Sequence, residues 1–123
     1  MHVAGVTVSH VLVPKVDADG ELHADELEPL DFRLQEISLE EFQACRRDAE
    51  PVDGMRKVIY AATIPPDRAR LWDNGQLQRY FGVEGPLELV RALLPTLGDV
   101  AQTLEVLNLL LATRIPRPGG PPA

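Results

Sequence analysis

The residue types that could support catalysis or bind a metal are few and scattered along this sequence. Histidine occurs only at positions 2, 10 and 23, and the single cysteine is Cys45. A metal site needs several ligands that converge at a defined spacing, which these positions do not match. Cys45 could act as a nucleophile only with a histidine as its base, and a lone helical cysteine is more often a small core residue. We therefore predict no catalytic residue, no metal ligand and no cofactor.

Two further motifs have a structural explanation that we favour. Asp17, Asp19 and Gly20 weakly resemble a calcium-binding loop, but the glycine is misplaced and the flanking helices are missing. Gly82 and Gly85 do not follow a strand in a nucleotide-binding pattern. The sequence predicts an acidic turn at the first motif and helix ends at the second.

Composition narrows the partners of the chain. Its 123 residues suffice for one domain, and twelve of its nineteen acidic residues lie within residues 17–50. The net charge of −7 disfavours nucleic acid and anionic membranes, although so dense an acidic run could also dock a basic partner. One cysteine excludes an intrachain disulfide. No signal peptide and no apolar run of about 18–20 residues is evident, so we expect a cytoplasmic protein.

The N-terminal third alternates in the manner of β-structure. Residues 3–13 predict a strand that ends at Pro14, and residues 30–37 predict a second strand with Leu30, Phe32 and Leu34 on one side. Residues 15–29, with the Asp19-Gly20 turn, predict a connecting loop or long hairpin connection. We expect the two strands to form an antiparallel hairpin, with residues 55–64 as a possible third strand.

Helical segments follow. Ser38 and Glu41 have the spacing of a capping box, and Pro51 with Asp53-Gly54 predicts the end of that helix. Residues 55–64 fit a helix or a buried strand, and we favour the helix because of Ala61-Ala62. Pro65-Pro66 ends this segment.

Shorter helices are predicted in the C-terminal half. Residues 67–72 predict one turn, and residues 75–81, capped by Asp73 or Asn74, predict a short helix. Its buried side is expected to hold Leu77, Tyr80 and Phe81, and Gly82 is expected to end it. Helices over 86–94 and from Thr96 or Gly98 to about Ala112 complete a single α+β domain over 1–113. This fold has an N-terminal β-hairpin of two or three strands followed by four to five short helices, and residues 114–123 predict a disordered Pro/Gly-rich tail.

The last helix is unusually apolar. One predicted stripe holds Leu97, Val100, Ala101, Leu104, Leu107, Asn108 and Leu111. Val106, Leu109 and Leu110 lie off that stripe. A helix that is apolar almost all round is buried by its own domain or by another chain. The alternatives are a core helix and a partner-binding helix, for which the candidates are Val100, Leu104, Val106, Leu107, Leu109, Leu110 and Leu111.

The stretch from Tyr60 to Asn108 resembles the XkdN-like tail assembly chaperones of tailed phages and prophages. The matching motifs, in order, are IYAATIPPDRARLWD, LQRYFGV, PLELVRALLP and LGDVAQTLEVLN. Upstream, DFRLQEISLEEFQACRRDA looks like the family's strand followed by Leu-Thr-Leu-Glu-Glu. The chain departs from the family where Leu109-Leu110-Leu111 follows Asn108, and in its Pro-rich tail.

The resemblance implies a non-catalytic protein of the host cytoplasm that is absent from the mature virion. It implies binding to the tape measure protein and assistance to the tail-tube protein during tail assembly. From the acidic charge and the lack of a long apolar run we expect no nucleic acid and no membrane partner. Self-association into a homo-oligomer stays open. The alternatives are a structural minor tail protein of the terminator or completion type, retained in the virion, and a small enzyme or ligand-binding module.

Overall fold

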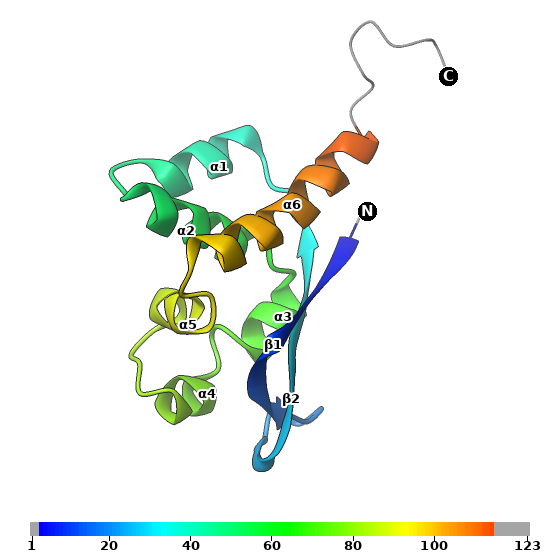
Figure 1. The fold of residues 1–123 in the computed structure, drawn as a ribbon, viewed down its shortest axis with the longest axis vertical. Helices are drawn as coiled ribbons and strands as arrows, with labels where there is room; N and C mark the ends of the chain where they lie inside the picture. The colour runs from blue at the N-terminus through cyan, green and yellow to red at the C-terminus, as the bar shows by residue number, and fades with distance from the viewer. Residues whose placement is uncertain (1–2, 115–123) are drawn as a thin grey trace, which may run out of the picture.

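A long β-hairpin forms one side of the molecule, and short helices pack against its other side (Figure 1). The structure, a computed structural model, describes residues 3–114, with side chains as far as residue 110. Strands β1 (Val3–Val16) and β2 (Leu22–Gln35) pair antiparallel. Over these residues the helices are α1 (Leu39–Arg46), α2 (Pro51–Ala62), α3 (Pro65–Arg70), α4 (Gly75–Tyr80), α5 (Pro86–Leu93) and α6 (Leu97–Arg114). The predicted α+β class and the order of hairpin and helices are confirmed.

The hairpin is longer than the sequence indicated. We expected Pro14 to end the first strand and residues 15–29 to form a loop, but β1 runs to Val16 and β2 begins at Leu22. The pairing register shifts between Val8 and Leu12 and again between Pro14 and Lys15. Proline is tolerated at such irregularities, where a regular ladder bond is not required. The predicted Asp19-Gly20 turn is confirmed within the short connection, where Gly20 has φ +82°.

The two faces of the hairpin differ because alternate side chains point to opposite sides. Val6, Val8, Leu30, Phe32 and Leu34 are buried under the helices. The opposite face is exposed to solvent near the strand termini, as the exposed residues 5, 7, 31 and 33 show. The alternation predicted for residues 30–34 therefore holds.

Helix boundaries follow the capping residues. The Ser38 hydroxyl accepts a hydrogen bond from the Glu41 N–H (3.0 Å), as predicted. Pro51 was expected to end a helix, but it is the first residue of α2. The N–H group at that position makes no hydrogen bond within a helix, so the missing N–H of proline costs nothing there. Gly54 lies inside α2, where an added Cβ would come within 3.3 Å of the Arg46 Cα, so it permits close packing of α1 on α2. The preference for a helix at residues 55–64 is confirmed as far as Ala62.

The C-terminal helices largely follow the prediction. Asn74 caps α4 through its side-chain oxygen, which accepts from the Gln76 and Leu77 N–H groups. Gly82 has φ +72° just past α4, as expected. The prediction that Tyr80 is buried was wrong: it is 47% exposed, because α4 is short and buries mainly Leu77. Helix α6 extends to Arg114, and the rest of the predicted tail lies outside the described residues.

The core lies between the hairpin and the helices. Its largest fully buried side chains are Trp72, Phe32, Leu30, Leu34, Ile59 and Leu71. Trp72 packs edge-on against Phe32 with ring centroids 5.3 Å apart, which joins the segment after α3 to β2. Its Nε1–H donates to Thr63 Oγ1, and the Thr63 hydroxyl donates to the Ile59 carbonyl. The Trp72 N–H and the Thr63 hydroxyl are thus both satisfied inside the core.

Candidate functional site

The residues considered for catalysis lie apart in the fold. His10 bonds to Asp99 on α6, and His23 bonds to Asp17 at the far end of the hairpin (both 2.8 Å). Cys45 is half-buried on α1, where burial, aided by the Glu41 charge, raises the pKa of its thiol and disfavours the thiolate. Within residues 3–114 no group of three or more His, Cys, Asp or Glu side chains is placed to hold a metal ion. His2 lies outside the described residues.

The described surface holds an apolar groove between α1, α2 and α6. Its volume is 590 Å³, and its lining residues are Ile37, Ser38, Leu39, Phe42, Arg46, Met55, Val58, Leu104, Leu107 and Asn108. Seven of these ten side chains are aliphatic, aromatic or methionine. The groove is therefore a surface that could bury apolar side chains from another molecule.

The groove is open because α1 covers the domain incompletely. Helix α1 contributes no fully buried residue, and its Leu39 is 69% exposed. It is held mainly by its contact with α2, where Gly54 lets the two backbones approach. On the opposite wall, α6 presents Leu104 and Asn108. A large exposed leucine beside a concave apolar surface is typical of an interaction site.

The polar groups of the groove are few and lie at its margin. Arg46 places its guanidinium over the Phe42 ring, 5.6 Å from the centroid. The Ser38 hydroxyl caps α1, and Asn108 is exposed on α6. Among the described residues that line the groove, Arg46 carries a charge and none is a carboxylate, although the chain as a whole is acidic.

The predicted partner-binding residues of α6 differ in exposure: some are buried, some half-buried and one exposed. Val100, Leu107 and Leu110 are buried against the domain, whereas Leu109 is 62% exposed and Val106 is half-buried. Leu104 is half-buried and shares the groove with Leu107. The Leu111 side chain lies outside the described residues. Of the predicted residues whose side chains the structure describes, Leu104 and Leu107 line the groove.

The buried side of α6 is rotated about the helix axis relative to the predicted apolar stripe, so that prediction was wrong in part. The buried side runs through Val100, Thr103, Leu107 and Leu110, while Leu97, Ala101 and Asn108 from the predicted stripe are exposed. Thr103 is polar and does not belong to the predicted apolar stripe, yet it is fully buried. Its hydroxyl donates to the Asp99 carbonyl (2.9 Å), and this bond lets it be buried among apolar side chains.

The sequence did not identify the other wall of the groove. Leu39, Phe42 and Met55 lie on predicted helical segments, but periodicity shows only that residues share a face and not what covers that face. Their spacing was the available signal. That α1 leaves these side chains partly uncovered becomes evident only from its position against α2 in the structure.

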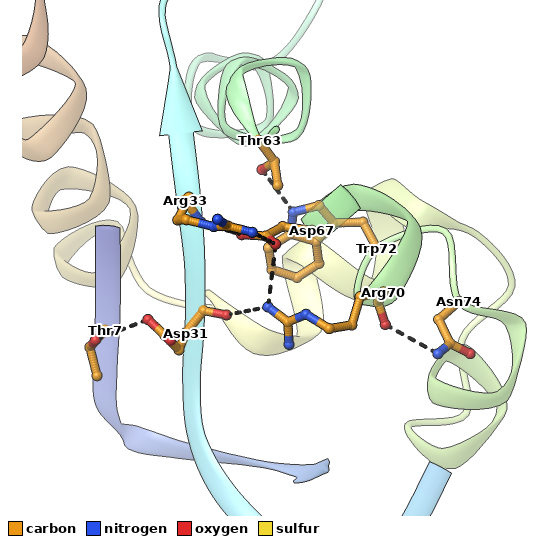
Figure 2. Close-up of polar contacts among 8 residues, drawn as sticks. All are labelled: Thr7, Asp31, Arg33, Thr63, Asp67, Arg70, Trp72 and Asn74. Atoms are coloured by element: carbon orange, nitrogen blue, oxygen red, sulfur yellow. Dashed lines mark hydrogen bonds and ion pairs between the residues drawn. The ribbon is translucent and has the colours of Figure 1, made fainter. Parts of the chain in front are cut away.

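A buried carboxylate next to the core fixes α3 to β2 (Figure 2). Asp67 is 3% exposed and accepts hydrogen bonds from the Arg33 backbone N–H (2.8 Å) and from its guanidinium (2.9 and 3.1 Å). Burial would raise the pKa of Asp67, but the bonds from Arg33 outweigh it and hold this pKa below its ordinary value of 3.8. These contacts are structural and lie away from the groove.

Replacing Asp67 with asparagine should lower the free energy of unfolding by about 1–3 kcal/mol, because charged hydrogen bonds to Arg33 are lost. The lowered pKa means that the native state binds this proton less readily than the unfolded chain. Its stabilisation is therefore complete above pH 3.8 and is lost as the pH falls below it. Denaturant unfolding from pH 7 to pH 3 should show a shallower acid loss in Asp67→Asn than in the native chain.

Asp25→Asn is the matched control, because it removes one negative charge from an exposed position of β2. This control should leave the stability at pH 7 within about 0.5 kcal/mol of the native value. If Asp67→Asn loses stability with falling pH as steeply as the native chain does, Asp67 is not the source of the acid-sensitive stabilisation.

A second ion-pair group secures the connection from α5 to α6. Arg56 is buried and donates to the carbonyls of Leu94 and Pro95 (both 3.1 Å) and to Asp53 (2.7 Å). Arg91 also bonds to Asp53, and these bonds from Arg91 and Arg56 lower the pKa of that carboxyl. This group fixes the start of α6 and hence one wall of the groove.

No helix in the described part of the chain has the length and apolar character needed to cross a membrane. Comparisons of the sequence with protein-family models and curated proteins, and of the structure with solved structures, found no match. The resemblance to the tail assembly chaperones therefore stays a prediction.

Proposed function

We propose that this protein is a non-catalytic phage tail assembly chaperone that binds the tape measure protein and assists tail-tube assembly in the host cytoplasm. The observation that carries the proposal is the apolar groove between α1, α2 and α6. The motifs from Tyr60 to Asn108 support the assignment to the tail assembly chaperones, and the groove is a surface suited to binding an apolar partner. The proposal assigns no reaction to the protein.

The groove suits an amphipathic helix as its occupant. Its lining is mostly apolar, and its walls, α1, α2 and α6, are themselves helices. Helices dock in such grooves through apolar side chains spaced three and four residues apart. Arg46 at the margin could pair with a carboxylate on the polar face of that helix.

The charge of the chain favours a role in keeping an apolar partner soluble. A net charge of −7 on a 123-residue chain opposes non-specific association between copies. A complex in which the groove covers apolar side chains and the acidic surface faces water should stay in solution. This combination is physically suited to a chaperone for long apolar helices.

Co-expression with the tape measure protein from the same phage genome tests the proposal. A tagged copy should recover the tape measure protein in the soluble fraction, and this protein should aggregate when expressed alone. Failure to recover it, with the tape measure protein equally insoluble in both cases, would overturn the proposal.

Mass spectrometry of purified phage particles separates the chaperone from the structural alternative. The chaperone should be absent from particles that contain the tube and tape measure proteins. Its presence at a fixed copy number would contradict the proposal and would fit a minor tail protein retained in the virion.

A further inference from the structure

The two outer edges of the hairpin differ in whether other parts of the chain form hydrogen bonds to their backbone groups. Along β2, Arg33 donates its N–H to Asp67 (2.8 Å) and accepts at its carbonyl from the Ile64 N–H (3.0 Å). Arg70 donates to the Asp31 carbonyl (2.8 Å). Figure 2 shows Asp67 and Arg70 of α3 on the side of β2 away from β1. The outer edge of β2 is therefore closed to another strand at Asp31 and Arg33, the residues that pair with Thr7 and Gly5.

The pairing register shows which backbone groups of β1 point away from β2, along the opposite edge of the hairpin. Gly5 pairs with Arg33 and Thr7 with Asp31. Residues facing each other in an antiparallel ladder alternate between hydrogen-bonded and non-bonded pairs. Because the N–H and C=O of Arg33 point away from β1, the Gly5–Arg33 pair is non-bonded, and the backbone groups of Gly5 and Thr7 point away from β2. No residue between 3 and 114 bonds to these outward groups.

This edge also lacks the usual protection against pairing. Residues 3–8 hold no charge and no proline, and the pairing is regular until the shift after Val8. Soluble proteins normally guard an open edge with lysine, proline or a bulge. Here Pro14 and Lys15 lie beyond the shift, so the segment from Val3 to Val8 is a regular, uncharged edge.

We propose that a second copy of this chain pairs with this edge, β1 against β1 in antiparallel orientation, with Gly5 of the two copies facing each other. This register places Val3 opposite Thr7 and Ala4 opposite Val6 of the second copy, within the regular segment. Centring on Thr7 would run into the shift after Val8. The result is a four-stranded sheet, and it is a closed dimer because the edge of β2 is blocked.

A second copy suits the edge better than a charged segment does. Ala4 and Val6 both face the helix-covered side of the sheet, so pairing extends that apolar layer across the two-fold axis. Val106 lies seven residues, or about two turns, beyond Asp99 on α6, and Asp99 bonds to His10 of β1. The half-buried Val106 therefore lies on the side of α6 that faces β1.

The dimer does not depend on the proposed chaperone function. The groove is lined by Leu104, Leu107 and Asn108 of α6, and none of residues 3–8 lines it. A variant that abolishes the dimer should leave partner binding in the groove intact, so failure of one proposal does not entail failure of the other.

Light scattering coupled to gel filtration tests the proposal on the full chain. At concentrations of tens of micromolar, the native protein should show twice the 13.6 kDa mass of one chain. A Cβ on Gly5 would meet nothing within 4 Å, so Gly5→Lys should fold normally. Because it places two like charges face to face, it should weaken dimerisation at least tenfold. Gly5→Thr, an uncharged β-former with equal room, should keep the dimer.

Disulfide trapping tests the register. In a Cys45→Ser background, Gly5→Cys should form a covalent dimer on oxidation, because facing residues of a bonded pair have Cα atoms about 5.5 Å apart. Leu27→Cys, which is 53% exposed on β2, should not form one. A native protein that is monomeric at all concentrations, or a Gly5→Lys variant that dimerises as well as the native chain, would overturn the proposal.

Discussion

Replacing Trp72 with alanine should lower the free energy of unfolding by about 3–5 kcal/mol, which is the usual range for loss of a large buried aromatic side chain. Trp72 is fully buried, packs edge-on against Phe32 and donates a hydrogen bond to Thr63. The substitution removes the contact that joins β2 to the segment after α3. Because small domains are stable by only about 5–15 kcal/mol, much of the stability should be lost. Denaturant titration followed by circular dichroism measures it.

Leu109→Ala serves as the matched control for the stability measurement. Leu109 is 62% exposed, so its truncation should change the free energy of unfolding by no more than about 0.5 kcal/mol. Equal effects of the two substitutions would show that Trp72 does not lie at the centre of the core.

Replacing Leu39 with aspartate should weaken binding of the tape measure protein about tenfold or more while leaving the protein folded. Leu39 lines the groove and is 69% exposed, so no core contact is lost. It is the first residue of α1, where a carboxylate interacts favourably with the helix dipole. The same charge in an apolar interface is unfavourable, and a loss of about 1.4 kcal/mol corresponds to the tenfold change. Titration calorimetry with a soluble tape measure segment measures it.

Leu27→Asp is the control for this charge, because Leu27 is 53% exposed on β2 and does not line the groove. It should bind as the native chain does. Leu109→Asp distinguishes the groove from the outer side of α6, where the sequence had also placed candidates. A large loss of binding in Leu109→Asp, with none in Leu39→Asp, would move the site to that outer side.

The hairpin and most helices were predictable because local rules determine them. The alternation of Leu30, Phe32 and Leu34, the Ser38 cap and the glycine at position 82 each specify structure over a few residues. The second half of the hairpin was missed because Pro14 and the acidic residues 21–28 disfavour a strand locally. Pairing along a long two-stranded ribbon, with register shifts that accommodate the prolines, overrides that preference.

The groove could be predicted only in part, because its walls come from segments far apart in the sequence. Leu104 and Leu107 were identified from the apolar character of α6, but Leu39, Phe42 and Met55 gave no sign that they line the same cavity. The rotation of α6 was wrong because a satisfied Thr103 lies on the buried side. Such a position is decided by a hydrogen bond within the helix, which hydrophobicity does not report.

Methyl NMR of the labelled protein, titrated with a helical segment of the tape measure protein, tests the central claim most directly. We predict that the methyl signals of Ile37, Leu39, Met55 and Leu104 shift together and saturate, while those of Leu27 and Leu109 stay unchanged. Saturable shifts confined to Leu109 and its neighbours, or no shifts at all, would contradict the assignment of the groove as the binding site.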